Sequence, residues 1–222
     1  MNYAIILASG SGSRINKDKP KQFFEINGKT VLEYTICAFE KNEMTDRIIL
    51  VVHESYIEFC SNFKFKKLYK ITKGGLTRQE SSFAGVDLIV EDNAKVLIHD
   101  GARPFVKNEI INNCYKALDN FEAVNTGIET SDTIMEVKNN IISDIPKRET
   151  LLRAQTPQGF KSGLIKTAHK LAKEQNIKVT DDAGLVVSLN LAPVYVVLGD
   201  IENIKITYPD DLKKAIEKLR QN

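Results

Sequence analysis

The sequence predicts an α/β protein whose mainly parallel central sheet is covered by helices on both faces. Short apolar runs alternate along the 222 residues with longer amphipathic stretches of helical period. Near-continuous apolar strands are typical of parallel sheets buried on both faces. Small-residue loops with basic side chains follow several of these runs, at the sheet edge where such folds bind ligands. We predict one three-layer, Rossmann-like domain over residues 1–222.

The composition is that of a globular protein, with 42% hydrophobic and 27% charged residues. The net charge is only +2, which disfavours non-specific binding of nucleic acid. No apolar run approaches the roughly 18 residues of a membrane span, and the chain begins directly with a strand-like run instead of a signal segment. The three cysteines and three histidines are scattered without metal-ligand spacing. We expect a cytoplasmic protein with reduced thiols and no zinc site, nucleic-acid partner or membrane association.

Six β-prone runs predict the strands: residues 4–8, 47–52, 68–72, 95–99, 123–128 and 194–198. Six amphipathic stretches predict the helices between and after them: residues 30–41, 78–90, 108–118, 162–174, 183–189 and 209–219. A capping box formed by Thr77 and Glu80 marks the start of the second helix.

Residues 132–145 depart from this alternation and predict a β-hairpin. Two β-prone segments flank the pair Asn139-Asn140, which suits a tight turn. No amphipathic helix in the sequence is placed to cover the hairpin, and two strands alone are marginally stable in water. We predict an arm at about residues 131–147 that docks on a second copy of the chain and forms a homodimer. The alternative is a flap on its own subunit.

The loop after the first strand has the features of a phosphate cradle. Gly10 and Gly12 allow backbone N–H groups to approach an anion, and Arg14 and Lys21 supply positive charge. The loop lacks the third glycine of the dinucleotide fingerprint, and the chain holds no complete P-loop motif. The alternative is a flexible turn with solvated basic residues.

Two further loops follow predicted strands and carry polar side chains. In residues 73–81, two glycines allow close backbone approach, and Ser81 is placed to donate to a sugar or phosphate oxygen; the alternative is a turn and a helix cap. After residues 95–99, Asp100 is a candidate ligand for Mg²⁺ or an acceptor for a substrate hydroxyl, and Arg103 is suited to grip a phosphate. The alternative is an ion pair between the two that shapes the loop.

Basic residues gather near small-residue loops in a chain whose charge is otherwise balanced. Arg148 and Thr156 belong to a polar strip at 148–160, and Lys205 follows the last predicted strand. The six cations near such loops are Arg14, Lys21, Arg78, Arg103, Arg148 and Lys205. This number exceeds what a single monophosphate needs and predicts a site for a polyanion.

Eight motifs occur in order over essentially the whole chain. They are residues 10–14 with Pro20-Lys21-Gln22, Gly74-Gly75 with Arg78 and Ser81, His99-Asp100 with Ala102-Arg103-Pro104, Asp132-Thr133, Arg148, residues 155–158, residues 180–183 and residues 203–207. Together they resemble the cytidylyltransferases that charge small polyol phosphates with CTP. Two branches fit: 2-C-methyl-D-erythritol 4-phosphate cytidylyltransferases of the non-mevalonate isoprenoid pathway, and ribitol-5-phosphate cytidylyltransferases, which supply wall and capsule polymers.

The sequence carries features of both branches. Those similar to the methylerythritol branch are Ala102 and residues 155–160 and 180–183. Those similar to the ribitol branch are residues 5–8, Phe105 and residues 144–146. Ser9 and Gly101 stand where the methylerythritol branch has alanines. We favour methylerythritol phosphate as the acceptor, with ribitol phosphate or a related pentitol phosphate as the alternative.

The resemblance implies a nucleotidyltransferase of the glycosyltransferase-A-like fold, a homodimer that works with CTP, Mg²⁺ and a polyol phosphate. It implies these catalytic residues: Arg14, Lys21, Arg148 and Lys205. The implied nucleotide-binding residues are Ala8, Ser9, Gly10, Gly12, Arg14, Lys21, Gly74, Gly75, Arg78, Ser81, Asp100 and Gly101. The implied substrate-binding residues are Asp100, Arg103, Thr133, Arg148, Thr156 and Lys205, with Arg103 and Thr133 presented through the arm of a partner subunit.

Two rival functions come from other classes. One is a non-catalytic module that binds a phosphate polymer or nucleic acid. The other is a dimeric regulatory protein that has kept the fold and lost activity. A site that had lost its activity would have no reason to keep four cations: Arg14, Lys21, Arg148 and Lys205.

Overall fold

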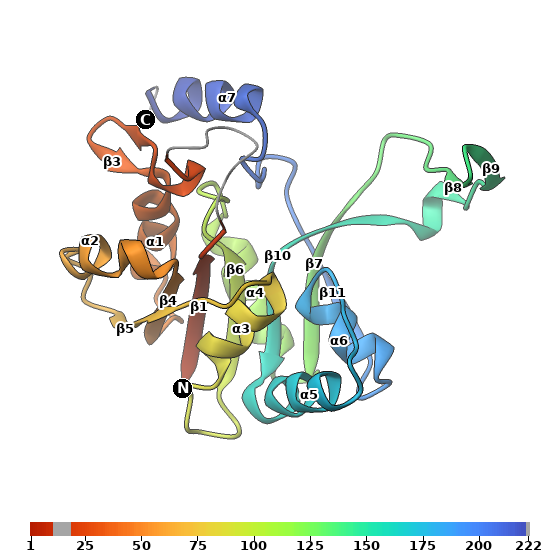
Figure 1. Ribbon diagram of the computed structural model, residues 1–222, viewed down its shortest axis with the longest axis horizontal. Coiled ribbons are helices and arrows are strands. Elements are labelled where there is room, and N and C mark those ends of the chain that lie inside the picture. Colours follow the sequence, from red (N-terminus) through yellow and green to blue (C-terminus); the bar gives the residue numbers. More distant parts are fainter. Residues whose placement is uncertain (11–18, 221–222) are drawn as a thin grey trace.

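The computed structural model describes residues 1–10 and 19–220. Figure 1 shows a central sheet between layers of helices, with a hairpin that projects from the body. The strands of the sheet are β1 (Asn2–Ala8), β4 (Arg47–Val52), β5 (Leu68–Lys73), β6 (Lys95–Asp100), β7 (Ala123–Glu129), β10 (Leu152–Lys161) and β11 (Val194–Leu198). The helices are α1 (Val31–Lys41), α2 (Ile57–Ser61), α3 (Arg78–Val86), α4 (Asn108–Ala117), α5 (Ser162–Glu174), α6 (Asp182–Ser188) and α7 (Pro209–Arg220).

The seven strands lie in the order β11-β7-β10-β6-β1-β4-β5. β1 pairs in parallel with β4 and β6, β4 with β5, and β7 with β11. Only β10 runs antiparallel to its neighbours in this sheet, β6 and β7. The predicted α/β fold with a mainly parallel sheet is confirmed, and the carboxyl ends of β1, β4, β5 and β6 meet at one edge.

Alternate residues of β1 enter two separate cores, one on each face of the sheet. Ala4 and Ile6 pack with α1 and α4, whereas Tyr3 and Ile5 pack with α3, α5 and α6. This two-sided burial explains why β1 reads as a continuous apolar run. A small third cluster joins α7 to the two-stranded hairpin of β2 (Glu25–Ile26) and β3 (Lys29–Thr30). None of the helices in the described part of the chain combines the length and apolar character that crossing a membrane requires.

The six predicted strands and six predicted helices are present within a few residues, and the largest difference is α3, which ends at Val86. The strip at 148–160 was not predicted to be a strand, yet most of it is β10. Its polar residues Gln155, Thr156 and Gln158 are buried and bond inside the protein, so the strand carries no apolar pattern. The Thr156-Pro157 peptide is cis, and the pairing of β10 with β7 shifts register between Ala154 and Gln158.

The predicted hairpin is confirmed as β8 (Glu136–Lys138) and β9 (Ile141–Asp144). Asn139 and Asn140 join the strands with φ of 51° and 63°, the left-handed conformation that a tight hairpin turn requires at both positions. Figure 1 shows the hairpin held away from the body. Every residue from 131 to 150 is exposed except Pro146. Its role as a dimerisation arm stays a prediction.

Candidate active site

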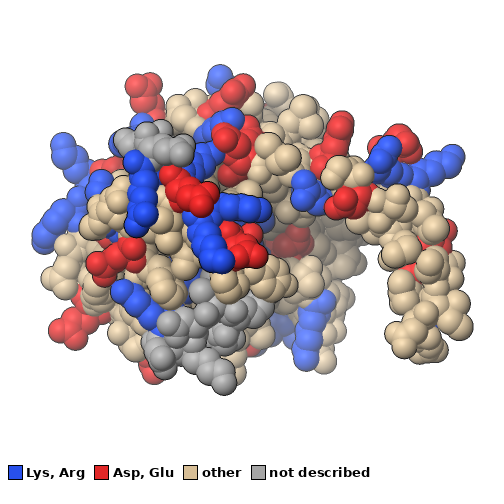
Figure 2. Space-filling model, turned by 90° about the horizontal axis from the view of Figure 1, so that it is seen from above, with Lys and Arg blue, Asp and Glu red and all other residues tan. Residues whose placement is uncertain are grey.

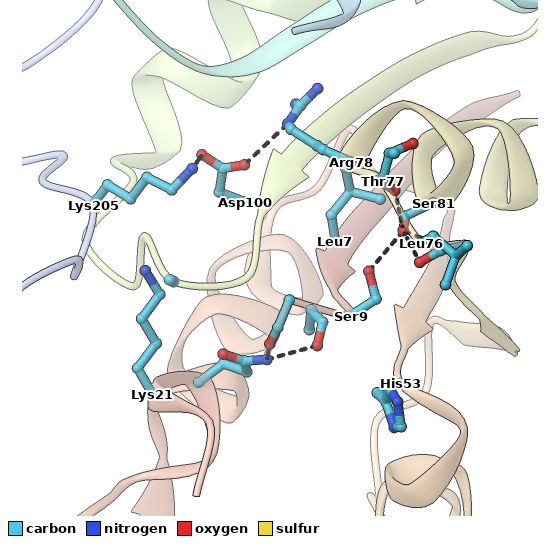
Figure 3. Close-up of a pocket in the computed structure, with 15 residues that line it drawn as sticks. Leu7, Ser9, Lys21, His53, Leu76, Thr77, Arg78, Ser81, Asp100 and Lys205 are labelled. Atoms are coloured by element: carbon cyan, nitrogen blue, oxygen red, sulfur yellow. Dashed lines mark hydrogen bonds and ion pairs between the residues drawn. The ribbon is translucent and has the colours of Figure 1, made fainter. Parts of the chain in front are cut away.

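A cavity of about 550 Å³ opens at the carboxyl ends of β1, β4, β5 and β6. This is the edge at which open α/β sheets bind their ligands, and the volume is typical of small-molecule sites. Figure 3 shows the residues that line it: Leu7, Ala8, Ser9, Gly10, Lys21, Gln22, His53, Gly75, Leu76, Thr77, Arg78, Ser81, Asp100, Ala102 and Lys205.

Gln22 fixes the backbone at the end of β1, at Ala8 and Gly10. It lies in a 3₁₀ turn, η1 (Lys21–Phe23), and its side chain is buried. Its Nε2 donates hydrogen bonds to the carbonyl oxygens of Ala8 and Gly10, each at 2.8 Å. These bonds set the path of the backbone where the loop borders the cavity. The same turn brings Lys21 to the cavity wall.

The glycine loop after β5 packs directly against the loop after β1. The Gly74 N–H donates to the Val52 carbonyl at 2.8 Å, and a Cβ at Gly74 would lie 2.4 Å from the Cβ of Ser9. Ser9 Oγ lies 2.8 Å from Ser81 Oγ, which also accepts the Gly75 N–H at 3.1 Å. The predicted capping box at the start of α3 is present. Glycine at 74 is thus required by the close approach of the two loops, which narrows this side of the cavity.

Asp100 stands at the end of β6 among three basic side chains. Its Oδ2 lies 3.0 Å from Lys205 Nζ and 3.2 Å from Arg103 Nε, and its Oδ1 lies 3.6 Å from Arg78 Nε. Burial favours the neutral acid, but the charges of Lys205, Arg78 and Arg103 outweigh it and hold the pKa of Asp100 well below its ordinary value. Asp100 is therefore ionised. Figure 2 shows the same mixture of basic and acidic side chains on the face above the strand ends.

This carboxylate does not fit the role of a ligand for a resident metal ion. Both of its oxygens already face cations, and a metal would compete with Lys205, Arg78 and Arg103 for them. Within residues 1–10 and 19–220, His, Cys, Asp and Glu form no group of three that is able to hold a metal. The prediction of Asp100 as a candidate ligand for Mg²⁺ is therefore not supported by its surroundings.

A buried chain of hydrogen bonds positions Asp100 from behind. The Asp100 N–H donates to Thr156 Oγ1 at 3.1 Å, and this hydroxyl lies 2.9 Å from His99 Nδ1. The other ring nitrogen, Nε2, lies 3.1 Å from the Arg103 carbonyl oxygen, which only accepts, so Nε2 carries the proton and Nδ1 accepts from Thr156. Burial lowers the pKa of His99 to about 4, so the ring is neutral near pH 7.

The chain matches a protein-family model over residues 2–221, and that model describes 2-C-methyl-D-erythritol 4-phosphate cytidylyltransferase. The chain belongs to this family. A cytidylyltransferase of that name from Clostridium acetobutylicum is 41% identical, with 100% of this chain and 99% of the relative covered. Another, from Clostridium novyi, is 42% identical, with 100% and 97% covered.

Solved structures agree with the family assignment. A 4-diphosphocytidyl-2C-methyl-D-erythritol synthase from Anaerococcus prevotii superposes with a TM-score of 0.86 at 30% identity and covers 99% of this chain and 96% of its own. The methylerythritol phosphate cytidylyltransferase of Francisella tularensis superposes with a TM-score of 0.83 at 29% identity, covering 97% and 98%. The predicted resemblance to the cytidylyltransferases is confirmed, and the protein is an enzyme of the nucleotidyltransferase class.

The cytidylyltransferase residues predicted from the sequence fall into four groups. Those that line the cavity are Ala8, Ser9, Gly10, Lys21, Gly75, Arg78, Ser81, Asp100 and Lys205. Those that lie next to lining residues without lining the cavity are Gly74, Gly101, Arg103 and Thr156. Those on the arm or at its base are Thr133 and Arg148. Gly12 and Arg14 lie outside the described residues.

The expectation that the arm presents Arg103 is wrong, because Arg103 lies in the loop after β6. Its Nε pairs with Asp100, and its Nη1 donates to the Asn203 carbonyl oxygen at 2.7 Å. The ion pair between Asp100 and Arg103, which the sequence left open as an alternative, is therefore present. Thr156 is buried and serves the hydrogen-bond chain described above.

Thr133 and Arg148 stand apart from the cavity of their own chain. Arg148 begins a 3₁₀ turn, η3 (Arg148–Thr150), and its Nη1 donates to the Ser131 carbonyl oxygen at 3.2 Å. This bond ties the two ends of the arm together and keeps Arg148 near the segment that carries Thr133. Neither residue lines the cavity. The predicted site is thus divided between a cavity and an arm.

Two buried amides that the sequence reasoning missed hold the site together. Gln22 holds the backbone at Ala8 and Gly10. Asn203 is fully buried, and its Nδ2 donates to the Thr156 carbonyl oxygen at 2.8 Å. The Ile206 N–H then donates to the Ala102 carbonyl oxygen at 2.9 Å, so Lys205 is fixed between two anchored neighbours. The signal was present in the sequence, because both amides lie inside motifs of the resemblance.

Proposed function

We propose that the protein transfers CMP from CTP to 2-C-methyl-D-erythritol 4-phosphate, and releases pyrophosphate, as a step of isoprenoid biosynthesis. The observation that carries this proposal is the cavity lined by Lys21, Arg78 and Lys205, in which Arg78 and Lys205 pair with the ionised Asp100, in a member of this family. A cationic cavity at a strand-end edge suits a nucleoside triphosphate and a second phosphate. We also propose a cytoplasmic location, which three free cysteines favour.

The cavity has two chemically different sides. In Figure 3, Lys21, Lys205 and Asp100 lie on one side, and Leu76 and His53 lie on the other. We assign the triphosphate to the basic side and the base to the side where Ser9 and the glycine loop approach closely. Because that side is narrow, we expect ATP and GTP to be poor substrates compared with CTP.

The proposed reaction is a direct displacement at phosphorus. An oxygen of the acceptor phosphate attacks the α-phosphorus of CTP, the bond to the bridging oxygen breaks, and pyrophosphate leaves with that electron pair. Positioning and charge neutralisation carry such reactions, so no covalent enzyme intermediate is needed. We assign to Lys21, and to Arg14 by the family pattern, the neutralisation of charge that develops on the crowded α-phosphate. Lys205 is placed to meet the acceptor phosphate.

We infer that Mg²⁺ arrives on the triphosphate of CTP as part of the substrate. The surroundings of Asp100 favour this over a resident metal. Bound to phosphate oxygens, the ion neutralises negative charge on the triphosphate and makes the pyrophosphate a better leaving group.

The active unit that we propose is a homodimer in which each arm serves the cavity of the other subunit. The arm carries Thr133 and Arg148 and is exposed on all sides. An isologous pair of arms would bury its apolar residues and deliver both polar groups to the second cavity. This arrangement gives a function to the division of the site between two regions.

The test is a pyrophosphate-release assay with purified protein, CTP and Mg²⁺. The acceptor panel contains the 4-phosphate of methylerythritol and the phosphates of ribitol, arabinitol and xylitol. We expect turnover with methylerythritol phosphate to exceed that with each pentitol phosphate. Preference for ribitol phosphate would move the enzyme to the other branch. Silence with every acceptor, in protein shown to be folded, would refute cytidylyl transfer.

A further inference from the structure

We propose that Asp182 is a positioning residue for this reaction: it holds Arg78 from inside the protein, so that Arg78 and Lys205 share Asp100 in the arrangement the cavity needs. The inference rests on the proposed function, because its effect is read in the use of CTP. It also gives a role to residues 180–183, a motif that the cavity itself does not include.

Arg78 bridges two buried carboxylates that come from distant parts of the chain. Its Nη1 donates to Asp182 Oδ2 at 2.7 Å, and its Nε lies 3.6 Å from Asp100 Oδ1. The Asp182 side chain is 1% exposed. Burial opposes its ionisation, but its neighbours, Arg78 foremost, together outweigh burial and keep the pKa of Asp182 below its ordinary value. Arg78 is therefore gripped by a second anion that does not reach the cavity.

Asp182 is itself held firmly at the start of α6. The preceding residue, Asp181, caps the helix by accepting the Gly184 N–H at 2.9 Å. The Asp182 N–H donates to Gln158 Oε1 at 3.0 Å, which ties the helix start to β10. The carboxylate that grips Arg78 therefore has a fixed position relative to the sheet, and so does the guanidinium that it holds.

The hydrogen-bonding groups around this contact are incompletely paired. Among the described residues, Arg78 Nη2, Asp182 Oδ1, Ser82 Oγ and His169 Nε2 are buried and have no hydrogen-bond partner. His169 lies on α5 with Nε2 3.6 Å from Asp182 Oδ1, too long for a hydrogen bond. A buried polar group that is left unpaired destabilises the fold. Unfavourable groups of this kind are typical of functional sites, and here the function is to orient a guanidinium.

The charges explain why the grip matters to the cavity. Asp100 faces three cations, and Lys205 is the most exposed of them, at 38% against 26% for Arg78 and 11% for Arg103. Because Arg78 also pairs with Asp182, Lys205 keeps its ion pair with Asp100. Without the negative charge at Asp182, Arg78 would move onto Asp100 and compete with Lys205. The loss should therefore appear in the handling of CTP as well as in stability.

The first test compares steady-state kinetics of Asp182→Asn with those of Asp210→Asn. Asp210 lies in the first turn of α7, and its side chain is exposed and pairs with Lys213, so this change removes the same charge away from the cavity. We expect Asp182→Asn to lower kcat/KM for CTP by roughly tenfold, the value of one hydrogen bond to a charged group. Its thermal midpoint should fall as well, because the variant breaks a buried ion pair. Asp210→Asn should stay within about twofold of the wild type. Equal effects of the two variants, or an unchanged kcat/KM in Asp182→Asn, would overturn the proposal.

A double variant shows whether Asp182 acts through Arg78. In an Arg78→Gln background, Asp182→Asn should have less than about a twofold further effect on kcat/KM, because the group that it positions is already gone. A full tenfold loss in that background would mean that Asp182 acts through something else, and would refute the proposed role.

An NMR measurement on the wild-type protein tests the grip without using turnover. The Arg78 Nε–H signal, assigned by its loss in Arg78→Lys, should show slow rotation about the Nε–Cζ bond. A freely rotating guanidinium would refute the grip even if Asp182→Asn fails to fold. Failure of the proposed function gives a different result: the wild type releases no pyrophosphate with any acceptor, while the Arg78 signal still shows a held guanidinium.

Discussion

The cavity and the arm are both rich in residues that the sequence marked as functional, but they are built in opposite ways. In the cavity, Asp100 is 8% exposed and is held by its own chain through ion pairs and a backbone hydrogen bond. On the arm, Ile141 is 71% exposed, and no residue from 131 to 150 is buried. Figure 2 shows the outer part of the arm as largely uncharged surface.

This difference indicates which parts of the site one chain is able to organise. The cavity residues are positioned by the fold around them and need no second molecule. The arm exposes a run of apolar side chains: Ile134, Met135, Val137, Ile141, Ile142 and Ile145. Exposed apolar surface of this kind marks an interaction site. We therefore expect one chain to suffice for nucleotide binding and two chains to be needed for acceptor binding.

Removing the arm should have the largest effect on activity. Deleting residues 137–142 is expected to produce monomers by light scattering and to reduce turnover below detection, because the acceptor would lose Thr133 and Arg148. CTP binding, measured by calorimetry, should survive in part, since Lys21 and Asp100 belong to the cavity. Asn140→Gly is the matched control, because glycine suits the φ of 63° at that position and leaves both strands intact. A monomeric variant with full turnover would show that the hairpin is a local flap.

Lys21→Ala tests the cavity side. We expect kcat to fall by about 10²–10³, as for the loss of a single transition-state donor, with a smaller effect on the affinity for CTP. Lys19→Ala removes a nearby basic side chain that pairs with Glu25, and it should leave turnover unchanged. Equal losses in kcat/KM and in CTP affinity would mean that Lys21 binds ground state and transition state alike.

The pH dependence of stability should report on the buried chain behind Asp100. His99 has a pKa of about 4 in the fold against an ordinary value of 6.5, so the unfolded state takes up the proton first as pH falls. The free energy of unfolding should be unaffected by this group above about pH 6.5 and fall by about 3 kcal/mol between 6.5 and 4. Asp100 acts only below its ordinary pKa of 3.8 and does not disturb this window.

Urea denaturation at pH 7.5, 6.0 and 5.0 measures this effect. His99→Gln should be less stable than the wild type at pH 7.5, because it loses hydrogen bonds, but its stability should change less between pH 6.0 and 5.0. Parallel pH curves for the two proteins would show that His99 does not titrate as described.

The smallest expected effect is a difference between two helix caps, Thr77 at α3 and Thr30 at α1. Thr77→Ala at α3 and Thr30→Ala at α1 each remove a cap and should lower the free energy of unfolding by about 1 kcal/mol. Thr77 lines the cavity and Thr30 does not, so Thr77→Ala alone should also raise KM for CTP. Equal KM values in the two variants would separate the α3 cap from nucleotide binding.

Much of the fold could be predicted because local chemistry and burial agree. The apolar run of β1 is buried on both faces, and the pair Asn139-Asn140 has the backbone that its turn demands. β10 could not be predicted in the same way. Its buried Gln155, Thr156 and Gln158 are polar residues that bond within the fold, and no periodicity marks burial of that kind.

The candidate site, too, could be predicted only in part. That Lys21, Arg78, Asp100 and Lys205 share one edge followed from strand ends, because parallel strands bring their following loops together. That Arg103 turns inward to Asp100 and Asn203 did not follow, since the sequence does not say which charges pair. The extent of the single domain and the roles of Gly12 and Arg14 stay predictions.

Mixing two inactive variants shows whether the arm of one subunit completes the cavity of the other. Lys21→Ala has a defective cavity and an intact arm, and Arg148→Ala has the reverse. After exchange of subunits, half of the dimers are mixed, and each mixed dimer holds one intact site, so about one quarter of wild-type turnover should return. Turnover that stays at the sum of the two separate variants, with mixed dimers shown to form, would contradict the claim.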